Sequence, residues 1–358
     1  ERLVRFSLAL VDKSSTIGRG GLGAVMGAKN LKAIVAKGTR GVDVAKPKEF
    51  RELCRNLMKE ILEYPKRKTV VDLGMLSGAP ISMAVGAIGG REKTAECTDK
   101  VYLESLKKAR RACPSCPLGD KDILEIRKDG EFKGLTSHTT SVMNAFWLLL
   151  VDGIEDHGQA VKCLDALNRS GLDLYAAMSL LNAVSDMYRD GLITTEVTDG
   201  VEPKKDFKTM MWLIDLISKQ KGWLSSILAG GWKTITGSIR GSEKYAVNIK
   251  GFDIVWDPRM LRLGTMEFEQ VVNQRGAHVA SGGSPTYLAP GRPLNHFLRH
   301  FERMGIPKDA VQRIYKPPIP EMGINVGRLT RYAEDWYTLL SSLGICARAH
   351  INRFYSAN

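Results

Sequence analysis

The chain has 358 residues, of which 44% are hydrophobic and 25% are charged, which is typical of a folded globular protein and excludes a disordered or fibrous one. No apolar run is long enough to span a bilayer, and no leader peptide is visible in these residues, which begin with Glu1 and not with Met. The net charge of +13 invites a nucleic-acid interpretation, but the basic residues are scattered and aromatic residues make up only 7% of the chain.

The first forty or so residues have the features of a small sheet. Apolar stretches at residues 8–11 and 33–38 predict two strands. Between them lies the glycine-dense sequence GRGGLGAVMG (residues 18–27), which predicts a loop. No other region predicts a sheet. The composition changes near residue 45, so we expect a β-containing piece over residues 1–45.

Helical periodicity dominates after Pro47, which predicts the start of a helix. Further helices are predicted to begin at Pro307 and to cover residues 101–112, 158–168, 174–189, 207–218 and 328–343. Gly171 and Gly191 are placed to end two of them, and residues 281–293 predict a loop. We therefore expect a mainly α chain with helical domains over residues 46–250 and 251–358.

Six cysteines occur in this long chain, and we interpret them as free thiols or cofactor ligands and not as a disulfide framework. The motif Cys113-Pro-Ser-Cys116 can hold two corners of a zinc site or an iron–sulfur cubane on one turn. Asp120 could add a third ligand through oxygen. A zinc ribbon needs a second such pair, so the motif alone leaves a cluster, zinc and no metal as open alternatives.

Several motifs, taken in order, resemble the aldehyde:ferredoxin oxidoreductase family. The sequence GRGGLGAVMGAKNLKAIVAKG is similar to the signature at the end of that family's first domain. The family's later motifs follow in order as CPSC (113–116), NRSGLD (168–173), WDPR (256–259), RGAH (275–278) and SSLGIC (341–346). The resemblance spans nearly the whole chain. It implies that the family's β-rich first domain is largely missing and that the last helical domain is incomplete.

The resemblance implies a tungsten bis-molybdopterin cofactor and a [4Fe-4S] cluster, and it leaves open a magnesium ion bridging the pterin phosphates. The implied pterin-binding residues are Arg19, Gly20, Gly21, Gly23, Asn168, Gly171, Leu172, Asp173 and Ser341. A guanidinium beside backbone N–H groups suits a phosphate, although a tight turn and a helix stop would also explain the glycines. Asn168 and Ser341 stand where the family has aspartate, so each lacks a charge.

The cluster ligands that the resemblance implies are Cys113, Cys116, Asp120 and Cys346, with Asp120 in place of the family's remaining cysteine. His278 is the implied catalytic proton-transfer residue, because histidine titrates near neutral pH. The family's active-site glutamate falls near residues 137–140. This chain has the sequence Ser-His-Thr-Thr there, without a carboxylate.

Three functions stay open at this point. The first is oxidation of an aldehyde to a carboxylic acid with ferredoxin as electron acceptor. The second is the tungsten subunit of a class II benzoyl-CoA (aryl-CoA) reductase, favoured by the missing carboxylate and by the segments RGAHVASGGSPTY and ERMGIPKDA. The third is a non-enzymatic zinc or nucleic-acid module. For the first two we expect a cytoplasmic protein, without nucleic acid, that forms an oligomer or a complex with ferredoxin or an iron–sulfur electron-transfer subunit.

Overall fold

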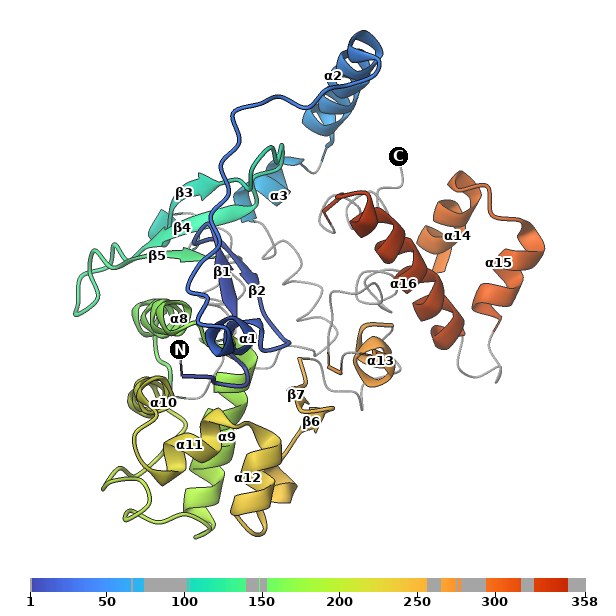
Figure 1. Ribbon diagram of the computed structural model, residues 1–358. Coiled ribbons are helices and arrows are strands. Elements are labelled where there is room, and N and C mark those ends of the chain that lie inside the picture. The colour runs from blue at the N-terminus through green and yellow to red at the C-terminus, as the bar shows by residue number, and fades with distance from the viewer. Residues whose placement is uncertain are drawn as a thin grey trace. The chain divides into compact units, whose positions relative to one another are not determined.

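The structure is a computed structural model that divides into two compact units. Unit 1 comprises residues 1–79 and 90–240, and unit 2 comprises residues 80–89 and 241–358. The described residues are 2–65, 67–73, 102, 104–139, 148, 153–255, 265–274, 276–277, 294–316 and 325–346. They form a mainly α chain with a small β-containing N-terminal piece, which confirms the expected fold class (Figure 1).

Unit 1 combines short strands with a group of packed helices. Its elements are β1 (Ala9–Val11), β2 (Ser15–Ile17), α1 (Leu22–Ala28), α2 (Pro47–Glu63), α3 (Arg67–Leu73), β3 (Lys107–Arg111), β4 (Lys121–Glu125), β5 (Thr136–Thr139), α8 (His157–Ser170), α9 (Leu174–Arg189), α10 (Phe207–Lys219), α11 (Trp223–Ala229) and α12 (Trp232–Ser238).

Unit 2 is mostly helical where it is described. Its elements are the 3-10 helix η3 (Ser242–Tyr245), β6 (Asn248–Ile249), β7 (Phe252–Asp253), α13 (Thr265–Val272), α14 (Leu294–Arg303), α15 (Lys308–Tyr315) and α16 (Val326–Ser342). Phe301 of α14 and Leu329 of α16 are buried together, and the Phe301 ring meets the Tyr332 ring edge-on at 5.0 Å. The predicted helices beginning at Pro307 and covering residues 328–343 are therefore confirmed within about two residues.

The N-terminal piece differs from its prediction in two ways. The strand expected at residues 8–11 forms as β1, which pairs with β2 in an antiparallel hairpin. The segment expected as a glycine loop is helical from Leu22, where α1 begins. No strand forms at residues 33–38, because nothing in the described chain pairs with them and Ile34 and Val35 are 77% and 90% exposed. A strand needs a partner to satisfy its backbone N–H and C=O groups.

A second sheet, with the antiparallel order β3-β4-β5, was not expected from the sequence. The predicted helix over residues 101–112 is wrong at its C-terminal half, where Lys107–Arg111 forms β3. Pairing with β4, whose Leu124 is fully buried, supplies the hydrogen bonds that a helix would have made internally. The hairpin between β3 and β4 carries the Cys-Pro-Ser-Cys motif at its turn.

The core of unit 1 lies between α8, α9 and α10, which Figure 1 shows packed together. All three were predicted, and each begins at an aspartate whose side chain accepts a backbone N–H of the first turn: Asp156, Asp173 and Asp206. Val161, Leu164 and Leu167 of α8 are buried as their spacing predicted. Gly171 ends α8 with a φ of 65°, a left-handed conformation that glycine adopts without strain.

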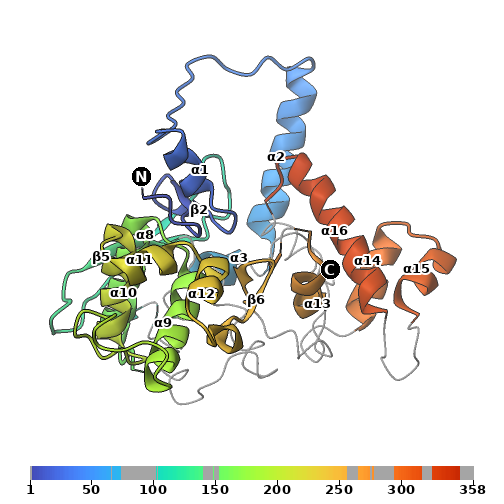
Figure 2. The same cartoon turned by 60° about the horizontal axis from the view of Figure 1, so that its bottom comes forward.

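The long helix α2 was predicted from Pro47 and forms with 17 residues, none of which is buried. Figure 2 shows it joined to α1 by a stretch of chain without helix or strand. Among the described residues, no helix is both long and apolar enough to cross a membrane.

Candidate functional site

A corner between α8 and α9 receives the N-terminal segment of unit 1. The Leu8 N–H donates to the Gly171 carbonyl at 2.8 Å, and the Asp173 N–H donates to the Phe6 carbonyl at 3.1 Å. Ser7 and Leu172 form an isolated antiparallel bridge between these bonds. The two segments, about 165 residues apart in sequence, are therefore fastened backbone to backbone. These bonds hold the glycine-dense sequence at residues 18–27, from here on the glycine segment, against the predicted pterin motif at residues 168–173.

The glycines of the glycine segment have different structural roles. A Cβ at Gly21 would lie 2.6 Å from the Arg5 carbonyl oxygen, and one at Gly23 would lie 2.8 Å from the Leu8 carbonyl oxygen. Both positions therefore require glycine so that α1 can approach the segment before β1. Gly20 is exposed with nothing within 4 Å of its would-be Cβ. The packing thus explains Gly21 and Gly23 but not Gly20, whose backbone remains accessible.

Arg19 and Gly18 face the start of α9. A Cβ at Gly18 would lie 3.4 Å from Asp173 Oδ2, and the Arg19 guanidinium carbon lies 4.8 Å from the centre of the Tyr175 ring. Arg19 has a φ of 52°, a left-handed conformation that is uncommon outside glycine and tends to occur at functional sites. The Tyr175 ring therefore orients the guanidinium that the sequence singled out as an anion-binding group.

Asp173 has a structural role besides any ligand contact. Its Oδ1 accepts the backbone N–H groups of Tyr175 at 3.0 Å and Ala176 at 3.1 Å, so it is the N-cap of α9. This leaves Oδ2 on the side of Gly18. One carboxylate thus both begins the helix and presents an oxygen to the glycine segment.

The Cys-Pro-Ser-Cys motif forms a single tight turn. The Cys116 N–H donates to the Cys113 carbonyl at 3.0 Å, Pro114 occupies the second position, and Ser115 has a φ of 59°. These features are those of a type II turn. Both cysteines are half-buried, and Asp120, four residues later, is 8% exposed. The Cys113 sulfur lies 3.9 Å from Ser15 Oγ on β2.

A buried ion pair fixes the hairpin that carries this turn. Lys107 Nζ lies 2.9 Å from Asp122 Oδ1 and also donates to the Val71 and Asp72 carbonyls at the end of α3. The Tyr102 hydroxyl donates to Asp122 Oδ2 at 2.7 Å. Burial raises the pKa of Asp122 even though Tyr102 and Lys107 act to lower it. These contacts join β3 and β4 to α3 beneath the cysteine turn.

The segment where the family has its glutamate lies on β5, beside another predicted pterin residue. Asn168 Nδ2 donates to the His138 carbonyl at 3.3 Å, and Arg111 Nη1 lies 2.8 Å from His138 Nδ1. Because a guanidinium can only donate, Nδ1 accepts and the proton of the neutral ring is on Nε2. Burial, Arg111 and Lys13 lower the pKa of His138 from its ordinary value near 6.5. The ring is therefore neutral at pH 7.

Other predicted site residues belong to unit 2 or lie outside the described residues. Ser341 and Cys346 are exposed residues of unit 2, whereas Cys113 and Cys116 belong to unit 1. His278, Thr140 and the loop at residues 281–293 lie outside the described residues. Within the described part of the chain, no group of three or more His, Cys, Asp or Glu side chains could hold a metal ion. The four-ligand cluster site stays a prediction.

Three contact residues were missed by the sequence interpretation. Ser15, Arg111 and Tyr175 touch Cys113, His138 and Arg19 respectively. Arg111 and Tyr175 lie within two residues of a predicted ligand, so proximity to the motifs could have indicated them. Ser15 is 98 residues from Cys113 and belongs to no recognised motif. Only the folded chain reveals that contact.

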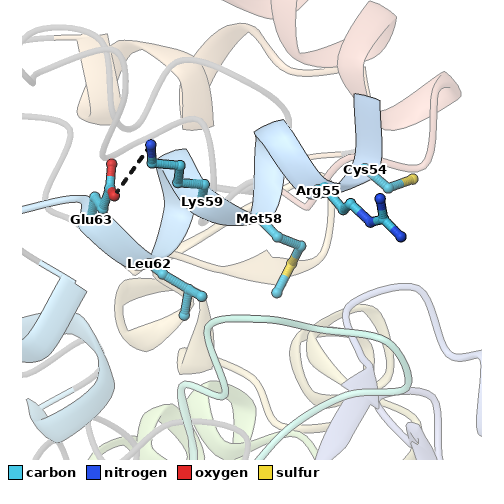
Figure 3. Close-up of a pocket in the computed structure, with 6 residues that line it drawn as sticks. All are labelled: Cys54, Arg55, Met58, Lys59, Leu62 and Glu63. Carbon is cyan, nitrogen blue, oxygen red and sulfur yellow. Dashed lines mark ion pairs between the residues drawn. The ribbon is translucent and has the colours of Figure 1, made fainter. Parts of the chain in front are cut away.

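The residues present fit the cofactors that the resemblance implied. Two half-buried thiols on one rigid turn suit two corners of a cluster, but the structure does not gather Asp120 with them into a group of three ligands. The accessible Gly20 backbone beside Arg19 suits a phosphate oxygen. By contrast, the hollow in Figure 3 is lined by six residues of α2 alone, including the ion pair between Lys59 and Glu63 at 4.0 Å. None of the predicted site residues lines this hollow, which lies on the surface of α2.

Comparisons with known proteins agree with the sequence resemblance. The family model for aldehyde ferredoxin oxidoreductase, domains 2 and 3, matches residues 52–357, and the model for that family's N-terminal domain matches residues 1–38. The chain is 25% identical over 367 residues to the tungsten-containing aldehyde ferredoxin oxidoreductase of Pyrococcus furiosus, covering 97% of this chain and 54% of that protein. It is 28% identical over 276 residues to the Pyrococcus abyssi protein of the same name, covering 72% of this chain and 44% of that protein.

A solved structure shows the same fold. It is the active-site complex BamBC of benzoyl coenzyme A reductase with 1,5-dienoyl-CoA, and its matching chain has a TM-score of 0.66 and 18% identity. The match covers 97% of this chain and 56% of that chain. The present chain thus spans about half the length of the curated relatives and of the solved chain that it matches.

Proposed function

This chain belongs to the aldehyde ferredoxin oxidoreductase family, and we propose that it forms part of a tungsten–pterin, iron–sulfur oxidoreductase. The observation that carries the proposal is that the glycine motif lies against the motif at residues 168–173, while the strand leading into the glycine motif reaches the cysteine motif. Gly18 lies against Asp173, and Ser15, on the strand that leads to Gly18, contacts Cys113. An electron-transfer cluster and a pterin must lie close together, and these contacts support that arrangement.

Each motif has a proposed duty toward the cofactors. Arg19 and the Gly20 backbone would hold a pterin phosphate, and Asp173 Oδ2 and Asn168 would hydrogen-bond the pterin ring. Cys113, Cys116, Asp120 and Cys346 would ligate the cluster. When bound, the tungsten–pterin group supplies two-electron chemistry, and the cluster allows electrons to leave one at a time. The protein's own residues bind, orient and shield these groups.

The first proposed reaction is oxidation of an aldehyde to a carboxylic acid, with electrons passed to ferredoxin. It is supported by the names of the Pyrococcus relatives, which are tungsten-containing aldehyde ferredoxin oxidoreductases. His278 is the proposed proton acceptor. We also propose that the chain forms an oligomer or is a subunit of a complex. Such an assembly would place it beside ferredoxin or a separate iron–sulfur subunit.

The second proposed reaction is reduction of an aryl-CoA, and one observation favours it. Near residues 137–140, where the family has an active-site glutamate, this chain has no carboxylate, and the histidine there, His138, is neutral with its Nδ1 accepting from Arg111. A neutral imidazole with its proton on Nε2 donates a hydrogen bond, whereas a glutamate would accept a proton. Aldehyde oxidation releases protons and is served by a base, so the missing carboxylate at residues 137–140 favours the reduction.

Metal analysis followed by two assays tests the proposal. Protein prepared with tungstate should contain tungsten, pterin and iron, and the Cys113→Ser variant should lose iron. Cys54→Ser, which changes an exposed cysteine on α2, is the matched control and should keep its iron. Zinc without tungsten or iron in the wild type would contradict the proposal. Turnover of aldehyde against aryl-CoA, each with a low-potential dye, separates the two reactions.

A further inference from the structure

The β1–β2 hairpin brings one hydroxyl to the cysteine turn. Ser15 lies on β2 opposite Val11, and Asp12 and Lys13 form the hairpin turn with φ values of 50° and 60°. The Ser14 N–H donates to the Val11 carbonyl at 3.1 Å, which closes that turn. The hairpin is continuous with the segment fastened to Gly171 and Asp173. Ser15 is therefore held by a backbone that is fixed on both sides.

Its partner sulfur is equally well fixed. Cys113 begins a proline-containing turn closed by the Cys116 N–H, and it follows β3, which the buried Lys107–Asp122 pair anchors. Ser15 Oγ and Cys113 Sγ lie 3.9 Å apart and both residues are half-buried. This is a long hydrogen bond of the kind that sulfur forms. Among the described residues, no hydroxyl makes a corresponding contact with the Cys116 sulfur, so the two thiols of the motif differ.

A thiol and a hydroxyl can each donate to the other, but a metal-bound cysteine is a thiolate and can only accept. In the loaded protein the proton of this contact therefore belongs to Ser15. From this geometry we propose that Ser15 is a positioning residue that donates to the Cys113 thiolate and raises the reduction potential of the cluster. The inference rests on the proposed function, because it requires a cluster at Cys113.

The direction of the effect follows from charge. Uptake of one electron makes a cluster more negative, and its sulfur ligands carry part of the added charge. A donor aimed at such a sulfur stabilises the reduced state more than the oxidised state, so hydrogen bonds to the sulfurs help set the potential. Ser15 keeps its proton throughout, and the step transfers one electron and no atoms. Removing the hydroxyl should therefore make the cluster harder to reduce.

Redox titration of the purified, metal-loaded protein tests the inference, with the electron paramagnetic resonance signal of the reduced cluster as the readout. Ser15→Ala should lower the ratio of reduced to oxidised cluster roughly fivefold at the wild-type midpoint, the effect of about one ordinary hydrogen bond. Ser15→Thr keeps a hydroxyl and should restore the wild-type ratio. Thr16→Ala removes an exposed hydroxyl from the same strand and should change nothing.

Iron content, measured for every variant, separates the possible failures. Wild-type iron in Ser15→Ala with an unchanged potential would overturn the inference and leave the proposed function intact. Loss of iron in Ser15→Ala alone would assign Ser15 to retention of the cluster and would also overturn the tuning role. Absence of iron from the wild type would refute the proposed function, and the inference with it. A merely structural role would not be expected to shift the potential at constant iron content.

Discussion

Two helices of unit 1 have similar lengths and similar amphipathic sequences, yet they differ in burial. The 16-residue α9 buries nine residues, whereas the 17-residue α2 buries none. Helix α9 also has an aspartate N-cap, and α2 begins after Lys46 without a capping side chain. The comparison teaches that apolar spacing predicts a helix but not its partner. Most helix stability in proteins comes from tertiary packing, so mutations should affect the two regions very differently.

The largest difference in the free energy of unfolding is expected between mutations of two ion pairs. Lys107 and Asp122 have side chains only 12% and 1% exposed, whereas Lys46 and Glu49 on α2 are 72% and 70% exposed. Lys107→Met should lower the free energy of unfolding by about 3 kcal/mol, because it removes the counter-charge of a buried carboxylate. Lys46→Met should cost less than about 1 kcal/mol. Urea denaturation measures both, and equal losses would contradict the described burial.

The next largest difference in stability should come from truncating a leucine on each helix. Leu181 on α9 is fully buried, and Leu53 on α2 is 65% exposed. Leu181→Ala should destabilise the protein by about 2–5 kcal/mol through lost burial and a cavity. Leu53→Ala should change stability by no more than about 0.5 kcal/mol. A loss of several kcal/mol for Leu53→Ala would instead reveal that a partner covers α2.

The cap of α9 allows a finer test that separates stability from cofactor binding. Asp173→Ala removes the acceptor for two N–H groups and should cost about 1 kcal/mol. Asp173→Asn keeps a capping oxygen, so its unfolding should resemble that of the wild type. If Oδ2 also serves the pterin, Asp173→Asn should still lose tungsten when the metal is measured. Full tungsten content in a stable Asp173→Asn variant would limit Asp173 to capping.

The smallest effect concerns pH. Burial, Arg111 and Lys13 lower the pKa of His138, so the unfolded chain takes up the proton first as pH falls. The stability contributed by His138 is present above about pH 6.5 and is lost as pH falls through that value toward the lower folded pKa. Arg111→Gln should raise the pKa and weaken this dependence. NMR titration of His138 measures it, with Arg55→Gln on α2 as the control that should leave the titration unchanged.

The sequence predicted α2, α8, α9, α10, α15 and α16 because their signals are local. The apolar spacing within α8, α9 and α10 and the glycine after α8 act over one or two turns. The family motifs and the turn-forming prolines of the cysteine motif were likewise readable. Membership of the family, confirmed by the matching family models, followed from those motifs.

Strands were predicted less well because their partners are distant in sequence. Residues 107–111 were predicted as the end of a helix over residues 101–112, yet they pair with β4 across the cysteine turn. Residues 33–38 have a strand-like composition and no described partner, and they remain exposed. Backbone hydrogen bonds between strands are decided by what lies opposite, which a sequence window does not contain.

The sequence by itself determined α2, α8, α9, α10, α15 and α16, the cysteine turn and the family, because each depends on residues within a few positions or on a motif read in order. Only the tertiary structure decided that Gly21 and Gly23 serve packing, that Tyr175 orients Arg19 and that Ser15 meets Cys113. Each of these contacts joins residues that are distant in sequence. The free energy that brings them together comes from burial in the α8–α10 core and from backbone hydrogen bonds between distant segments.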